Sequence, residues 1–124
     1  MLRLYMLDFA LFAAHEMDSA YWREWDLFRL PGGEAAFVLL HVPLVFLLAW
    51  GGRELAEGRP WGDRVAALLA LSGFAALFIH GGFIAAGHPE FRTPASAGLI
   101  AVMAAVSVAL GYLALRRLIG GRRA

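Results

Sequence analysis

The chain contains no cysteine, lysine, asparagine or glutamine. Without cysteine, disulfides, thiolate metal sites and thiol redox chemistry are excluded. Charged residues are also scarce, at 17% of the 124 residues, whereas soluble domains carry roughly 25%. The net charge is only +1, which offers no electrostatic footprint for nucleic acid. The composition therefore argues against an ordinary soluble domain and against a nucleic-acid-binding one.

Apolar residues make up 60% of the chain and gather in long runs between clusters of charge. Such runs are typical of proteins that use the lipid bilayer as solvent. Each span must be helical, because lipid offers an open backbone no hydrogen-bond partners. Spans of roughly 16 to 23 residues cover about 24 to 35 Å, enough for a hydrocarbon core of about 30 Å. The sequence predicts one all-α domain, a four-helix transmembrane bundle with spans at about residues 4–22, 35–50, 65–87 and 95–115.

The arginines predict how this bundle is oriented. Eight fall on one predicted face and three on the other, so the positive-inside rule places both termini in the cytoplasm. Residues 4–14 also have the length of a signal-peptide core, but Asp8 interrupts them, and we expect the segment to be retained. Asp8 is expected to pair with Arg3 or another arginine near the inner surface. The inner face carries Arg3, Arg53, Arg59, Arg64, Arg116, Arg117, Arg122 and Arg123, and the outer face carries Arg23, Arg29 and Arg92.

Histidines recur at one depth in three predicted spans. His15, His41 and His80 each lie six or seven residues from the outer end of a span, which is roughly 9 to 10 Å below the boundary. His88 lies at the mouth of the same face. Ionisable groups in hydrocarbon are costly, and several at one level indicate a site. A single membrane histidine, by contrast, is usually satisfied by a neighbouring backbone group or a water.

Acidic and aromatic residues surround the first of these histidines. His15, Asp18, Trp22 and Trp25 recur at helical spacing and predict one stripe. Glu16 is offset from this stripe by about 100° and is expected to point toward a neighbouring helix. Glu24 lies on the opposite side of an uninterrupted helix, so it can join a site with His15 only if the helix bends or ends near Ser19.

This set of side chains suits a metal site. Imidazole and carboxylate ligands bind zinc or iron, and His15, His41, His80 and His88 are the candidate ligands. Glu16 is then the candidate base, and Asp18 completes or orients the ligand sphere. The remaining candidates are Trp22, Trp25 and Glu24, which would contact a bound cofactor or substrate, although the tryptophans equally suit interfacial anchors.

Two alternatives need no metal. The same histidines and carboxylates can perform acid–base chemistry on a lipid-soluble small molecule or bind it. They can also carry protons or ions in a transporter, or contact a partner as part of an accessory subunit. The last predicted span has no ionisable residue and a seam of small residues, which allows close helix packing within the bundle or in a homo-oligomer. The seam consists of Ala97, Ala101, Ala105 and Ala109.

The motifs resemble a family of small bacterial membrane proteins of unknown function. The resemblance lies in His15-Glu16-x-Asp18 with Glu24-Trp25, Leu40-His41-x-Pro43-Leu44, Ile79-His80 and His88-Pro89. It implies a bacterial inner-membrane location and marks the histidines and acids named above. Ile84 departs from the pattern, since the resemblance leads us to expect a second histidine there, and a dinuclear centre is correspondingly disfavoured. A fainter similarity to emopamil-binding, sterol-isomerase-like proteins rests on analogy of residue types alone.

Overall fold

The computed structural model describes residues 1–121, and every regular element in that range is a helix. The predicted all-α class is confirmed. Two of the arginines used to predict orientation, Arg122 and Arg123, lie outside the described residues. The helices are α1 (Leu2–Tyr21), α2 (Glu24–Leu27), α3 (Gly33–Ala56), α4 (Pro60–Ala85) and α5 (Pro94–Gly120).

The helix ends follow from local chemistry. Both α4 and α5 begin with proline, whose missing N–H costs nothing in the first turn of a helix. The hydroxyl of Thr93 caps α5 by accepting the Ser96 N–H at 3.1 Å. The second predicted span, 35–50, is too short, because α3 continues through Gly51. An added Cβ at Gly51 would collide with the side chain of Val65, so this glycine lets α3 approach α4.

Three helices, α3, α4 and α5, are long and apolar enough to cross a membrane. The prediction of four membrane spans is thus confirmed only in part. Helix α1 has 20 residues, which is sufficient length. Three carboxylates lower its hydropathy, however: Asp8, Glu16 and Asp18.

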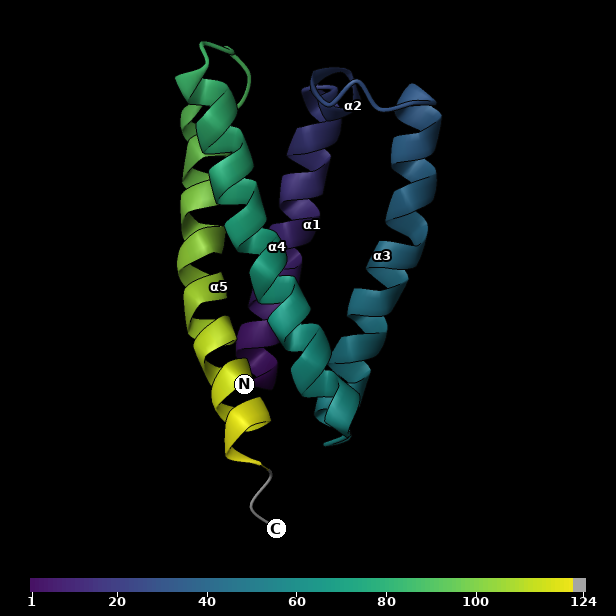
Figure 1. The fold of residues 1–124 in the computed structure, drawn as a ribbon, viewed down its shortest axis with the longest axis vertical. Helices are drawn as coiled ribbons and strands as arrows, with labels where there is room; N and C mark the ends of the chain where they lie inside the picture. The colour runs from purple at the N-terminus through teal and green to yellow at the C-terminus, as the bar shows by residue number, and fades with distance from the viewer. Residues whose placement is uncertain (122–124) are drawn as a thin grey trace.

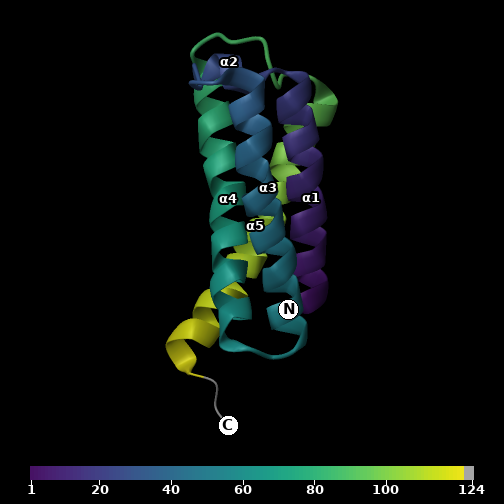
Figure 2. The same ribbon diagram turned by 90° about the vertical axis from the view of Figure 1, so that its right-hand side faces the viewer.

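The helices run side by side, with α2 at one end of the molecule and both termini at the other (Figure 1). Helix α4 packs along both α5 and α3, while α1 packs mainly on α5. Helix α3 meets α4 near the terminal end and diverges from α1 toward the α2 end (Figure 1). Seen from the α3 side, α4 and α1 flank α3 (Figure 2). Within the described chain α3 packs against α4 and α1 but not against α5.

The apolar core is built from buried side chains of α1, α3, α4 and α5. Tyr5 and Leu48 are at most 1% exposed, and the Tyr5 hydroxyl donates a hydrogen bond to the Leu48 carbonyl. Between helices in lipid, such side chains stabilise the bundle through van der Waals packing and hydrogen bonds. The other large members of this core are Phe12, Leu55, Val65, Leu69, Met103 and Leu110.

Asp8 is also buried, at 1% exposed. The expectation that Asp8 pairs with an arginine near the inner surface is wrong. Instead, the Ser107 hydroxyl of α5 donates to the carboxylate, at 3.0 Å from Oδ1 and 3.1 Å from Oδ2. Asp8 shares the buried face of α1 with Phe12 and His15, whereas Arg3 is exposed. The helix therefore turns the two side chains to different environments.

Candidate functional site

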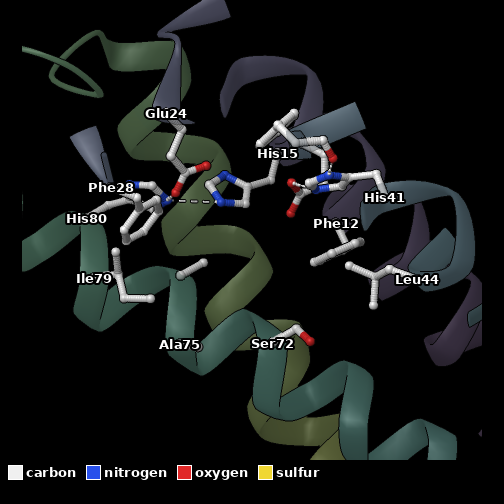
Figure 3. A pocket seen from close by; sticks show the side chains of 13 residues that line it. Phe12, His15, Glu24, Phe28, His41, Leu44, Ser72, Ala75, Ile79 and His80 are labelled. Atoms are coloured by element: carbon white, nitrogen blue, oxygen red, sulfur yellow. Dashed lines mark hydrogen bonds and ion pairs between the residues drawn. The ribbon is translucent and has the colours of Figure 1, made fainter. Parts of the chain in front are cut away.

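A pocket of about 330 Å³ lies between α1, α3 and α4 near the α2 end. Helices α1, α3 and α4 form its walls, and α2 lies over it (Figure 3). Five of the residues lining it are ionisable: His15, Glu16, Glu24, His41 and His80. The rest are mostly apolar. The predicted convergence of three histidines on one pocket is therefore present in the structure.

His15 and His80 face each other across the pocket wall (Figure 3). Their Nε2 atoms lie 3.1 Å apart, and the ring planes meet at 74°. The rings are 3% and 1% exposed. Their Nδ1 atoms are buried with no hydrogen-bond partner among the described residues. Since a neutral imidazole carries one N–H, one ring must donate and the other accept across the Nε2 contact.

Glu24 reaches this pair because α1 ends early. The helix stops at Tyr21, and Arg23 adopts a left-handed conformation at φ 54°. The short helix α2 then returns over the pocket and places Glu24 Oε1 3.5 Å from His80 Nε2. This fulfils the condition under which Glu24 was expected to join the site. Burial raises the pKa of Glu24 above its ordinary value, which favours the protonated acid.

Glu16 and His41 form the second pair, across the gap between α1 and α3. The Nε2 atom of His41 lies 2.6 Å from Glu16 Oε2, and Nδ1 lies 2.6 Å from the Phe37 carbonyl. A carbonyl only accepts, so Nδ1 must carry a proton and donate it. One proton then lies between His41 Nε2 and Glu16 Oε2. It is bound either to His41, which is then an imidazolium, or to Glu16, which is then a carboxylic acid. Glu16 and His41 can therefore exchange a proton.

Asp18 and Trp22 are not brought into the pocket. The Ser96 hydroxyl of α5 donates to Asp18 Oδ1 at 3.0 Å and accepts from Trp22 Nε1 at 3.3 Å. Both side chains thus join α1 to α5. The predicted stripe separates because His15 faces α4 while Asp18 and Trp22, one to two turns later, face α5. Asp18 does not line the pocket, and its role beside His15 stays a prediction.

Two further candidates lie outside the pocket lining. Trp25 packs on Phe37, with ring centroids 5.3 Å apart, because the end of α1 breaks the helical spacing that related it to His15. His88 lies in the α4–α5 connection, with Nδ1 3.6 Å from Glu90 Oε2. Neither residue contributes to the His15–His80 contact.

Phe91 is a site residue that sequence reasoning missed. It comes from the α4–α5 connection, is 0% exposed, and adopts a left-handed φ of 64°. Its ring centroid lies 4.0 Å from that of His80 and 6.4 Å from that of His15. Such backbone conformations are costly for a non-glycine residue and cluster at functional sites. The signal in the sequence was a lone apolar residue between Glu90 and Arg92 in a polar connection.

Metal binding is not supported by the arrangement. Among residues 1–121, no three His, Asp or Glu side chains form a group that could hold a metal ion. The donors divide instead into His15, His80 and Glu24 on one side and Glu16 and His41 on the other. What the pocket offers directly is two hydrogen-bonded acid–base pairs beside an apolar surface.

Comparison with known proteins gives a family without an assigned activity. Residues 1–117 match the Family of unknown function (DUF6713). No curated protein and no solved structure matches the chain.

Proposed function

The chain belongs to this family of unknown function, DUF6713, and we propose that it is a four-span membrane protein that binds a lipid-soluble molecule in the pocket and exchanges protons with it. In this proposal α1 completes the bundle, because its three carboxylates, Asp8, Glu16 and Asp18, are hydrogen-bonded to side chains of α5 and α3. Both termini lie in the cytoplasm, the pocket lies in the outer half, and the membrane is a bacterial inner membrane. Three apolar helices and the arginine distribution support this placement.

The Glu16–His41 contact carries the proposal. Its 2.6 Å separation and the donor role of Nδ1 leave one proton between the Glu16 carboxylate and the His41 imidazole. General acid–base catalysis needs such a group within hydrogen-bond reach of a bound molecule. The same pocket holds a second exchanging pair in His15 and His80. One pair can therefore take a proton from a ligand while the other returns one.

The test is mass spectrometry of small molecules extracted from the purified protein. We expect the wild type to retain a lipid-soluble molecule that Glu16→Gln and His80→Ala lose. His88→Ala is the matched control, since it removes a histidine outside the pocket and should retain the molecule. A wild-type protein that carries no such molecule, after purification in several mild detergents, would overturn the proposal.

A zinc or iron ion bound by His15 and His80 is the second candidate. Two imidazole nitrogens on one tetrahedral zinc are separated by roughly 3.3 Å, given Zn–N bonds of about 2.0–2.1 Å. The observed Nε2 separation of 3.1 Å is close to that value. Glu24 is the nearest carboxylate that could follow as a third ligand. The unpartnered Nδ1 atoms of both rings count against this candidate, since ligating histidines ordinarily donate through the other nitrogen.

Elemental analysis decides between the candidates. A metal protein should carry one ion per chain in the wild type and in His88→Ala, and less than a tenth of that in His15→Ala. Failure to find a stoichiometric ion after growth in supplemented medium would remove the metal candidate and leave the acid–base proposal standing.

We also propose that two copies associate through the alanine seam of α5. The members of the seam are all exposed: Ala97, Ala101, Ala105 and Ala109. Their exposure supports a role for the seam in contact with a second copy. Because the chain lacks cysteine, Ala101→Cys should form a disulfide dimer in membranes, whereas Leu71→Cys on exposed α4 surface should not. Equal dimer yields would contradict the seam.

A further inference from the structure

We propose that the ligand is a neutral, hydroxyl-bearing lipid with a single chain, which enters the pocket from the bilayer between α1 and α3. This inference rests on the proposed function and specifies its ligand. It is argued from a groove outside the pocket, from the aromatic side chains at the α2 end, and from the charged residues around the Glu16–His41 pair, here called the polar pair.

A groove of about 720 Å³ runs between α1 and α3 on the far side of the Glu16–His41 pair. Its only ionisable lining residues are Glu16 and His41. Both belong also to the pocket lining, as does Phe37. The hydrogen-bonded pair therefore stands at the boundary between groove and pocket. The apolar side chains along the groove include Ala13, Met17, Val38, Val42, Val45 and Phe46.

The length of the groove fits one lipid chain. Its lining on α3 extends from Phe37 to Phe46, ten residues that rise about 13 Å along a helix. His41 lies near the middle of this stretch, so a chain that starts at the polar pair follows the groove for about 7 Å toward Phe46. Because His41 is expected roughly 9 to 10 Å below the outer boundary, such a chain would reach about the midplane of a hydrocarbon core of about 30 Å. Two such chains would need a second groove beside the first, and the described lining is a single cleft between two helices.

Aromatic side chains pack at the α2 end of the pocket. Phe91 is 0% exposed and packs on His80, with ring centroids 4.0 Å apart. Phe28, just after α2, packs against Phe83 of α4 with ring centroids 5.5 Å apart. A ligand with a long apolar chain gains nothing by passing these aromatic rings. The apolar groove between α1 and α3 offers the direct route from lipid to the polar pair.

The charges select the headgroup. Within the described chain, the residues that line the pocket and groove include two carboxylates and no arginine. Phosphate and carboxylate headgroups would be buried in a low-dielectric setting beside these acids with no arginine to pair with, which is costly. A hydroxyl can instead donate to the Glu16 oxygen that His41 does not contact, since His41 binds Oε2. That match favours an alcohol over an anionic lipid.

The experiment uses the full chain in lipid nanodiscs and a long-chain alcohol with a diazirine at mid-chain. After irradiation, peptide mass spectrometry should place the label on α1 and α3 residues of the groove, and excess unlabelled long-chain alcohol should reduce it at least five-fold. Val42→Trp, which fills the groove, should reduce the label similarly. Val108→Trp is the matched control, because both valines are exposed, at 64% and 54%.

Label distributed evenly over the lipid-facing helices, without competition, would overturn the groove. A fatty acid of the same chain length should compete at least ten-fold less well than the alcohol, and equal competition would overturn the headgroup assignment. These failures are distinguishable from failure of the proposed function. If a lipid-soluble molecule is retained by the wild type and lost from Glu16→Gln, but the label lies elsewhere, only the groove and its alcohol are wrong.

Discussion

At the scale of single residues, the pocket depends on imidazoles whose two nitrogens have different surroundings. His41 is fixed through Nδ1 on a helix carbonyl and presents Nε2 to Glu16. His15 and His80 present Nε2 to each other and leave Nδ1 without a partner in the described chain. A buried nitrogen without a partner costs about 1–3 kcal/mol. The structure thus holds the second pair at a cost in stability, as expected of groups kept for binding or chemistry.

The coupling between Glu16 and His41 is measurable. In a double-mutant cycle of Glu16→Gln and His41→Phe, we expect an interaction free energy of about 0.6–1.7 kcal/mol, the range for hydrogen bonds between membrane helices. Reversible unfolding in mixed micelles is the measurement. The longer His88–Glu90 contact, at 3.6 Å in the α4–α5 connection, serves as the control and should give a smaller value. Equal coupling in both cycles would show that the 2.6 Å contact has no special strength.

Phe91 should control access to the buried imidazoles. Phe91→Gly removes the ring while accepting the left-handed backbone without strain, so the fold should survive the loss of packing. We expect diethyl pyrocarbonate to modify His80 at least five-fold faster in this variant. Phe91→Leu keeps an apolar cover and should stay close to wild type, as should Phe78→Ala on the 75% exposed outer surface. Unchanged reactivity of a folded Phe91→Gly protein would refute the covering role.

At the scale of helices, the packing of α4 on α5 depends on Gly73. An added Cβ there would collide with the Ser107 hydroxyl and lie 2.9 Å from Ser107 Cβ. The same hydroxyl binds Asp8 of α1, so three helices meet at this glycine. Gly81 on the same helix is a matched contrast, because an added Cβ would meet no described heavy atom within 4 Å.

Gly73→Ala should therefore destabilise the protein while Gly81→Ala should not. We expect a loss of about 1–3 kcal/mol for the first, the usual cost of overpacking, and a change within about 0.5 kcal/mol for the second. Thermal unfolding of the two variants in the same detergent is the measurement. If both variants unfold with the wild type, the close approach of α4 and α5 is incorrect.

The helices were largely predictable and the break between α1 and α2 was not. Long apolar runs bounded by Pro and Gly marked α3, α4 and α5, since hydropathy and helix breakers act locally. No glycine or proline marks the turn at Trp22 and Arg23, where Arg23 itself takes the left-handed conformation. That unmarked turn brings Glu24 into the pocket and takes Trp25 out of the expected stripe. The facing direction of Asp18 likewise depends on which helix lies beside it, which helical periodicity alone does not give.

At the scale of the whole molecule, the start of α1 and the end of α5 lie at one end and α2 lies at the other (Figure 1), as the proposed four-span bundle requires. Since the natural chain has no cysteine, single-cysteine variants report topology without background. In intact cells, a membrane-impermeant maleimide should label Pro89→Cys in the α4–α5 connection and spare Gly58→Cys in the α3–α4 connection. Permeabilised cells should show both. The reverse pattern would invert the orientation, and labelling of both in intact cells would refute a spanning bundle.

The contact between Asp8 and Ser107 has a consequence for biogenesis. The two residues are 99 positions apart, and one lies on the first helix and the other on the last. At roughly 5–20 residues per second, translation separates them by about 5–20 s. During that interval the least apolar helix is already outside the ribosome, while the hydroxyl that will satisfy its carboxylate has not been made. Stable insertion of α1 must therefore wait for α5 or depend on an insertase that shelters it, and a chain stopped before Ser107 should leave its N-terminal helix extractable by alkali.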